Sequence, residues 1–193
     1  MPIRIGARPD HGFDEPLGLL SDCHRRIEHF LAVLTAFARQ SDRPLEPAER
    51  SQLEGALVYF ATAAPRHTAD EEHSLFPRLR ALRDPAARAA LDTVARLEHE
   101  HAIADVAHKA VDAIVRRWLV EGCLTESDRA EFRDQLASLK AIYEEHIGIE
   151  DRELFPAARR LLSSEEISDI GREMERRRRA DAPQPSRPVQ PAG

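Results

Sequence analysis

The chain has 193 residues, of which 42% are hydrophobic and 32% charged, and its formal net charge at pH 7 is −6. These values suit a single soluble domain with a packed core, and the acidic excess argues against a general nucleic-acid binder. The longest apolar stretch, Phe30–Ala38, is too short to cross a bilayer, and the first residues lack the apolar segment of a secretory signal. We therefore expect a cytoplasmic protein that neither binds nucleic acid nor enters a membrane.

Prolines and capping residues divide the chain into predicted elements. Residues 1–15 lack periodicity and predict an irregular arm, and the four prolines within 180–193 predict a disordered tail. Between them, helical periodicity predicts long helices over 16–41, 47–83, 84–121 and 125–162. Prolines 65 and 77 predict kinks in the second helix. A capping box formed by Ser163 and Glu166 begins a short last helix over 163–179.

Each long helix carries one apolar stripe with spacings of three and four residues, and the connections between the helices are short. Stripes of this kind are buried when helices pack side by side. The sequence therefore predicts an all-α protein, an antiparallel up-down-up-down four-helix bundle over residues 16–162.

A histidine interrupts the apolar stripe of every long helix, at His24, His67, His101 and His146. In the second and fourth helices a glutamate follows four residues later, at Glu71 and Glu150, on the same face one turn further along. The distances from each histidine to the neighbouring helix ends match to within a few residues; Arg83 and Pro85, for example, each lie 16 residues from the nearest of these histidines. We therefore expect the six side chains to meet in one layer of the bundle.

The chain also repeats itself, because the segment from His67 to Pro77 parallels the segment from His146 to Pro156, with Leu-Phe-Pro closing both. Two helix pairs related by an approximate two-fold axis would each supply one histidine and one His-x3-Glu motif. Buried and unpaired, these groups would be costly, whereas a metal centre satisfies them together. Six ligands exceed the needs of one tetrahedral zinc, so we predict two bridged metal ions. Ligation without thiolate favours iron, with manganese and zinc as alternatives.

The pattern resembles the hemerythrin HHE cation-binding family over roughly residues 17–162. The resemblance implies a four-helix bundle that holds two iron ions joined by an oxo or hydroxo bridge, with Glu71 and Glu150 as bridging ligands. Oxygen-carrying hemerythrins have a fifth histidine one turn after the ligand of the third helix, where this chain has Asp105. Two histidines per iron, two bridging carboxylates and a bridging oxygen would then leave one open coordination position on each iron. Such a site favours reaction with O₂, peroxide or nitric oxide over storage of O₂ on one iron.

Several polar residues near the stripes have more than one interpretation. His108 lies two turns from His101, which predicts a residue lining a cavity or supporting the ligands. Glu28 and Asp105 follow His24 and His101 by four residues, but they lie on the flank of the stripe and are expected in solvent. Tyr143 precedes His146 by about one turn, where its ring packs in the core and its hydroxyl reaches a neighbour.

Three functional hypotheses follow from the residues. The first is a metal-binding protein that binds or senses O₂ or reactive oxygen and nitrogen species, its partner being a small diatomic or peroxide ligand. The second is a peroxidase- or oxidase-like enzyme in which Tyr143 or His108 moves protons. The third is a regulatory module in which loss of metal loosens the bundle and exposes a site for a protein partner, whose identity the sequence leaves open.

Overall fold

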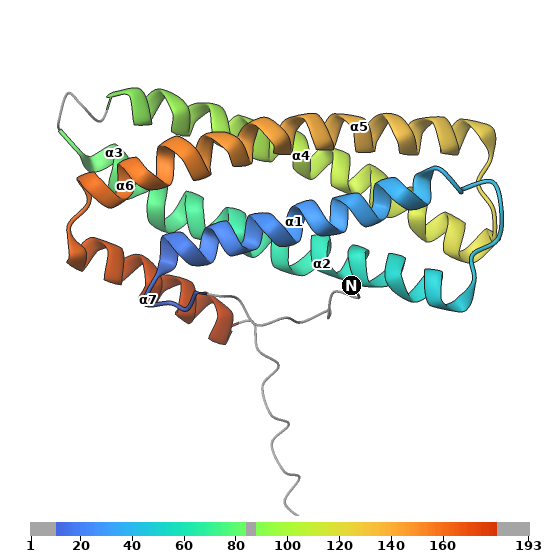
Figure 1. The fold of residues 1–193 in the computed structure, drawn as a ribbon, viewed down its shortest axis with the longest axis horizontal. Coiled ribbons are helices and arrows are strands. Elements are labelled where there is room, and N and C mark those ends of the chain that lie inside the picture. The colour runs from blue at the N-terminus through green and yellow to red at the C-terminus, as the bar shows by residue number, and fades with distance from the viewer. Residues whose placement is uncertain (1–10, 84–87, 181–193) are drawn as a thin grey trace, which may run out of the picture.

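A computed structural model describes residues 11–83 and 88–180 (Figure 1). The first ten residues of the predicted arm, the predicted helix start at 84–85 and the tail from residue 181 lie outside this range. The predicted all-α class is confirmed, since every regular element within the described range is helical. In chain order these elements are α1 (Pro16–Ala38), α2 (Pro47–Asp70), η1 (Glu71–Leu75), α3 (Phe76–Ala81), α4 (Arg88–Glu121), α5 (Glu126–Ile149), η3 (Glu150–Leu154), α6 (Phe155–Leu161) and α7 (Ser164–Ala180).

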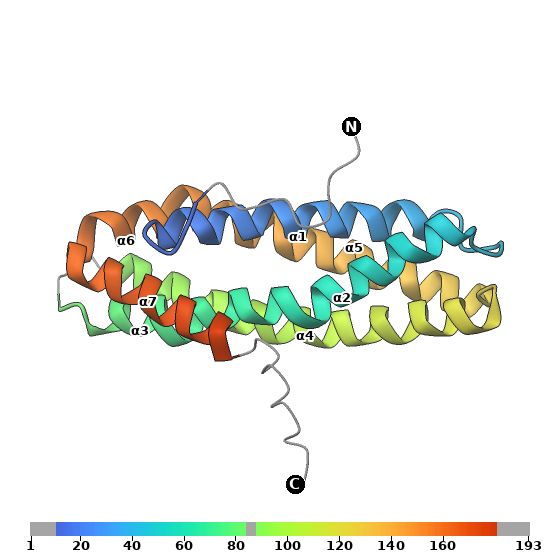
Figure 2. The same ribbon diagram turned by 90° about the horizontal axis from the view of Figure 1, so that it is seen from below.

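Helices α1, α2, α4 and α5 lie side by side along the long axis of the molecule (Figures 1 and 2). Following the colours along the chain, α1 and α4 run in one direction, and α2 and α5 run in the other. Helix α7 packs across the end of the molecule formed by α3 and α6, where it contacts α1 and α2. Each of the four long helices thus faces a common interior.

Most predicted helix starts agree with the structure. Pro16 and Pro47 occupy first-turn positions, where a missing N–H removes no helical hydrogen bond. Thr125 caps α5 by accepting a hydrogen bond from the Asp128 backbone. The first helix ends at Ala38 rather than at residue 41, because the chain turns there and the Ser41 hydroxyl donates to the Ala38 carbonyl at 2.9 Å.

The second and fourth helices are each divided by a π-helical turn that the sequence did not predict. In η1 the backbone N–H of Phe76 donates to the carbonyl of Glu71, five residues earlier, and Phe155 bonds to Glu150 in the same way in η3. Such a turn inserts one residue and shifts the helical phase, and it is frequent at functional sites. The glutamates that begin these turns and the Leu-Phe pairs that follow them are all buried.

Two apolar clusters fill the interior. The larger one packs around Trp118 and Phe132 between the four long helices. The smaller one contains Phe76 and Phe155 and is covered by Ile170 and Met174 of α7, which are both fully buried. The histidines and glutamates singled out above lie between the two clusters, since Ile27 and Ala64 belong to the larger one and the Leu-Phe pairs to the smaller. A polar layer therefore divides the core.

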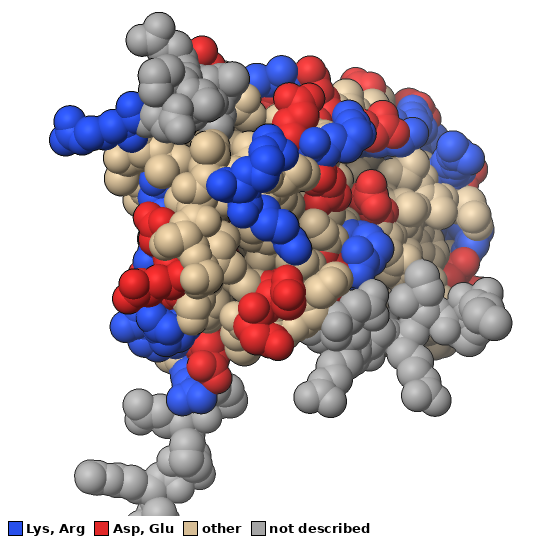
Figure 3. Space-filling model, turned by 60° about the vertical axis from the view of Figure 1, so that its left-hand side comes forward, with Lys and Arg blue, Asp and Glu red and all other residues tan. Residues whose placement is uncertain are grey.

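The surface carries charges of both signs. On the face shown in Figure 3, acidic and basic side chains are interspersed rather than gathered into areas of one sign. Among the described residues, no helix has both the length and the apolar character that a membrane crossing requires.

Candidate metal centre

The six residues predicted as ligands meet in the interior. One group contains His24, His67, Glu71 and Glu150, and a second contains His101 and His146 with the same two glutamates. Within each group the ligand atoms all lie within 4.8 Å of one another. All six side chains are buried or nearly so, and both glutamates are completely inaccessible. The two groups share both carboxylates, which is the arrangement expected of two ion positions with common bridges.

The ring nitrogens and carboxylate oxygens approach one another closely. The Nε2 atoms of His67 and His101 lie 3.3 and 3.4 Å from the two oxygens of Glu71. Those of His24 and His146 lie 3.1 and 3.3 Å from Oε2 of Glu150. Each glutamate therefore faces one histidine of each group, and all four rings direct Nε2 toward the centre.

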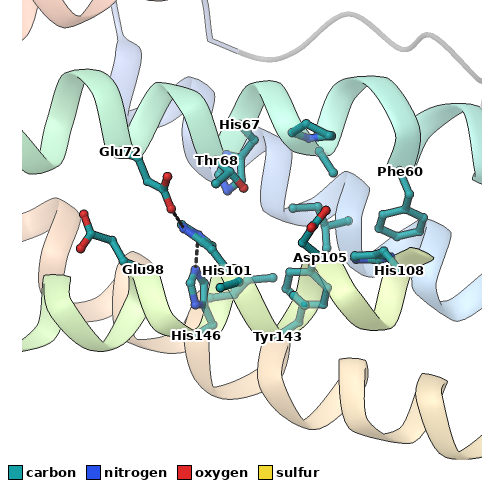
Figure 4. Close-up of a pocket in the computed structure, with 16 residues that line it drawn as sticks. Phe60, His67, Thr68, Glu72, Glu98, His101, Asp105, His108, Tyr143 and His146 are labelled. Carbon is teal, nitrogen blue, oxygen red and sulfur yellow. Dashed lines mark hydrogen bonds and ion pairs between the residues drawn. The ribbon is translucent and has the colours of Figure 1, made fainter. Parts of the chain in front are cut away.

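A carboxylate holds the outer nitrogen of three of the four rings. The Nδ1 atom of His101 donates to Glu72 at 2.9 Å (Figure 4). That of His24 donates to Asp151 at 3.0 Å, and that of His146 to Glu100 at 3.0 Å. Because an ionised carboxylate only accepts hydrogen bonds, it fixes the proton on Nδ1 and leaves the lone pair of Nε2 for a metal. Among the described residues, Nδ1 of His67 has no such partner.

In the metal-free chain, burial and the same carboxylates shift the pKa values of the histidines. Burial opposes the charge on the rings, but the hydrogen bond to Asp151 and the adjacent carboxylate of Glu150 raise the pKa of His24 to about 10. Against the same effect of burial, Glu71 and Glu72 raise the pKa of His101 to about 9. Burial and the nearby positive rings instead lower the pKa of His67. The site thus concentrates negative potential that a proton or a metal cation can occupy.

The two glutamates differ in their response to burial. Burial and the neighbouring Glu150 raise the pKa of Glu71 to about 7. Burial acts in the same direction on Glu150, but the adjacent rings of His146 and His24 outweigh it and lower its pKa. All four carboxylate oxygens are buried without a properly oriented hydrogen-bond partner in the described part of the chain. Buried polar atoms are rarely left in this state, so the donor set suits a metal.

The distance between two of the histidine rings provides a separate test of whether the site can hold a metal ion. The Nε2 atoms of His101 and His146 lie 3.1 Å apart. Two imidazole nitrogens bound to one ion at about 2.0–2.1 Å, at nearly right angles, would be about 3 Å apart. The pair is therefore spaced as two ligands of one ion would be.

Comparison with known proteins agrees with this geometry. The family model described as "Hemerythrin HHE cation binding domain" matches residues 15–158, which include all six residues of the layer. The chain belongs to the hemerythrin HHE cation-binding domain family. It is also similar to an uncharacterised protein of Haemophilus influenzae, at 26% identity over 167 residues, which cover 86% of this chain and 91% of that protein. The predicted family resemblance is confirmed.

Other predicted residues of this HHE domain take the positions expected for them. Glu28 and Asp105 are exposed and belong to neither group of metal-binding side chains. His108 lines a cavity beside the layer, and its Nε2 atom lies 2.8 Å from the Tyr143 hydroxyl.

Sequence reasoning missed the residues that support this layer. The carboxylates of Glu72 and Asp151 directly follow the two layer glutamates, so the acidic pair in each repeat was a signal that could have revealed them. Asp70 precedes Glu71 and is completely buried, where it is bound by Arg177 and Arg178 of α7. These two arginines, from the run Arg176–Arg179, therefore anchor α7 beside the metal motif.

Proposed function

We propose that this HHE domain is an antiparallel, up-down-up-down four-helix bundle that holds two iron ions and binds or senses O₂ or reactive oxygen and nitrogen species. The observation that supports the proposal is the sharing of Glu71 and Glu150 by two groups of imidazoles. In this arrangement His24 and His67 would hold one ion, His101 and His146 the other, and the two glutamates would bridge them. A bound pair of iron ions would supply reversible electron transfer to a diatomic or peroxide ligand.

Other side chains around the site orient the imidazoles, exclude water from one end and line a cavity at the other. Asp151, Glu72 and Glu100 hold three imidazoles in the tautomer that directs Nε2 inward. The rings of Phe155 and Phe76 stack against His24 and His101, at centroid distances of 5.5 and 6.2 Å, and keep water from that end of the layer. On the other side, His67, His101 and His146 line a cavity through which a small ligand can reach the centre.

Metal analysis of the purified chain tests the proposal. We expect about two irons per chain and absorption in the near ultraviolet from oxo-to-iron charge transfer. Replacing Glu71 by alanine should reduce the iron content to one or none, because both positions use this carboxylate. Glu28→Ala is the matched control, since Glu28 follows His24 by four residues just as Glu71 follows His67, yet is exposed. A folded wild-type protein that takes up no iron from a ferrous solution would contradict the proposal.

A peroxidase- or oxidase-like activity is the second candidate. It is favoured by the hydrogen bond between His108 and Tyr143, which places a phenolic proton beside the layer (Figure 4). Peroxide consumption by the iron-loaded protein, followed in wild type and in His108→Ala, tests this candidate. Turnover should fall strongly in the variant while its iron content stays at the wild-type value, and unchanged turnover would remove His108 from the mechanism.

A further inference from the structure

The cavity beside the histidine layer is larger than a diatomic or peroxide ligand requires. It opens between α2 and α4 and has a volume of about 490 Å³, with Tyr143 of α5 and Ile27 of α1 also contributing to its lining. The rings of His67, His101 and His146 form one end, and Phe60, His108 and Tyr143 group at the other (Figure 4). Pockets of about 300–1,000 Å³ are typical of sites for small organic molecules.

Small side chains keep this space open. Ala64 and Pro65 of α2 and Ala102 and Ala104 of α4 line the cavity. A second hollow of about 440 Å³ continues along the same two helices and shares Phe60, Pro65 and His108 with the first. The opening is thus elongated along α2 and α4, and most of its wall is apolar.

One polar pair is directed toward this apolar space. The Nε2 atom of His108 lies 2.8 Å from the hydroxyl oxygen of Tyr143, and its ring stacks on Phe60 at a centroid distance of 4.3 Å. Burial lowers the pKa of His108 to about 4, against a weak opposing effect of Asp105, so the ring is neutral at pH 7 and carries one N–H. Its Nδ1 atom is buried without a partner in the described part of the chain.

The partnerless nitrogen indicates where the proton of His108 lies. Buried N–H groups are rarely left without an acceptor, whereas an unused lone pair is tolerated more often. We therefore assign the proton to Nε2, which donates to the oxygen of Tyr143. The hydroxyl hydrogen of Tyr143 is then free to donate to a molecule in the cavity.

The charges along the cavity restrict the class of molecule. Among the described residues, Glu72, Glu98 and Asp105 line it and no lysine or arginine does, so a negatively charged molecule finds no unpaired cation there. These carboxylates already pair with His101, Arg80 and Lys109 respectively, so a positively charged molecule gains little. An uncharged molecule with an aromatic body and one hydroxyl group matches this lining best.

We propose that the cavity between α2 and α4 binds a small uncharged phenol, with its ring against Phe60 and its hydroxyl oxygen accepting a hydrogen bond from Tyr143. Such a molecule would lie directly beside the histidine layer. The inference extends the proposed function by naming an organic molecule that the same site accommodates. Phe60 and Tyr143, the two residues that would contact the phenol, belong to neither group of predicted metal ligands, so its binding can be measured with and without metal.

Binding of p-cresol, measured by ligand-observed NMR and by calorimetry, tests the proposal. The titrations use the protein as purified and after chelation, so that a failure to bind iron is distinguished from a failure to bind phenols. We expect p-cresol to bind in both states, and toluene, which lacks the hydroxyl, to bind more weakly. Tyr143→Phe should weaken p-cresol binding about fivefold and leave toluene unaffected. Equal binding of p-cresol and toluene to the wild type would refute the hydrogen bond to Tyr143.

A matched pair of variants locates the site. Ala102 and Ala113 both lie on α4 and are both exposed, but only Ala102 lines the cavity. Ala102→Leu should reduce p-cresol affinity at least tenfold, because the larger side chain occupies the opening, and Ala113→Leu should bind like the wild type. Equal affinities in the two variants, or no p-cresol binding by the wild type, would overturn the proposal.

Discussion

The Nδ1 atom of His146 lies 3.0 Å from a carboxylate oxygen of Glu100, which is supplied by the neighbouring helix α4. A hydrogen bond of this kind orients the ring and makes Nε2 a stronger metal donor. His101 is held in the same way by Glu72, so both imidazoles of one proposed ion position are supported. In the other position only His24 is supported, by Asp151, while Nδ1 of His67 lacks a partner in the described part of the chain.

This difference predicts two unequal metal affinities, with the ion at His101 and His146 bound more tightly. Replacing Glu100 by glutamine should weaken that step by about 10–100-fold, as loss of such a partner typically does. Stepwise titration of the metal-free protein, followed by calorimetry, measures both steps. The control is Glu98→Gln, on the same helix, whose carboxylate pairs with Arg80 and not with a ring. Equal losses in the two variants would contradict the prediction.

The sequence could predict the level at which the histidines meet, because helical rise and helix ends alone determine it. It could not predict the π-helical turns after Asp70 and Ile149, since each depends on an alternative hydrogen bond that the tertiary packing selects. The role of Glu100 was equally hidden. Its carboxylate reaches a ring on another helix, and no spacing within α4 encodes such a contact.

The ion pairs between Asp70 and α7 lead to a prediction about stability. Arg177 and Arg178 both bind this fully buried carboxylate, and Arg177 also donates to the Ser74 hydroxyl at 2.6 Å. Replacing both arginines by methionine leaves a buried charge without a partner, which costs about 3–5 kcal/mol. Chemical denaturation of the metal-free protein measures this loss.

The two outer arginines of the same run provide the control. Arg176 and Arg179 are exposed, so their double replacement by methionine removes the same charge with little effect on the free energy of unfolding. Adding Asp70→Asn to the inner double variant should restore part of the loss, because the unpaired charge is then gone. Equal destabilisation by the inner and outer pairs would show that the buried contact contributes nothing.

The buried ring of His108 predicts a dependence of stability on pH. Burial lowers its pKa to about 4 from an ordinary value of 6.5, so below pH 6.5 the unfolded chain takes up a proton that the folded chain does not. The corresponding stability is lost as the pH falls from about 6.5 to about 4. His108→Gln removes the titrating group, so the difference in unfolding free energy between wild type and variant should change by about 2 kcal/mol between pH 7 and pH 4.5. Denaturant titrations of the metal-free proteins at pH 7 and 4.5 test this, and a constant difference would exclude the effect.

Glu71 and Glu150 differ in their surroundings, so replacing each by glutamine should have opposite effects on the stability of the metal-free protein. Burial and repulsion from Glu150 raise the pKa of Glu71 to about 7, so at pH 8 its charge destabilises the folded chain without metal. Glu71→Gln should therefore raise the unfolding free energy of the metal-free protein. Glu150→Gln should lower it, because the charge of Glu150 pairs with His24 and His146.

Iron should reverse the order of stability of the wild type and Glu71→Gln. An ion that binds only the folded chain stabilises it by about 4 kcal/mol when its free concentration is 1,000 times the dissociation constant. The wild type gains this stabilisation, whereas Glu71→Gln loses a ligand of both ions and gains little. Thermal unfolding with and without ferrous iron should show the variant as the more stable protein after chelation and the less stable one with metal. If the wild type were the more stable protein in both conditions, the carboxylate of Glu71 would be part of the structural core, and its burial would not reflect selection for metal binding.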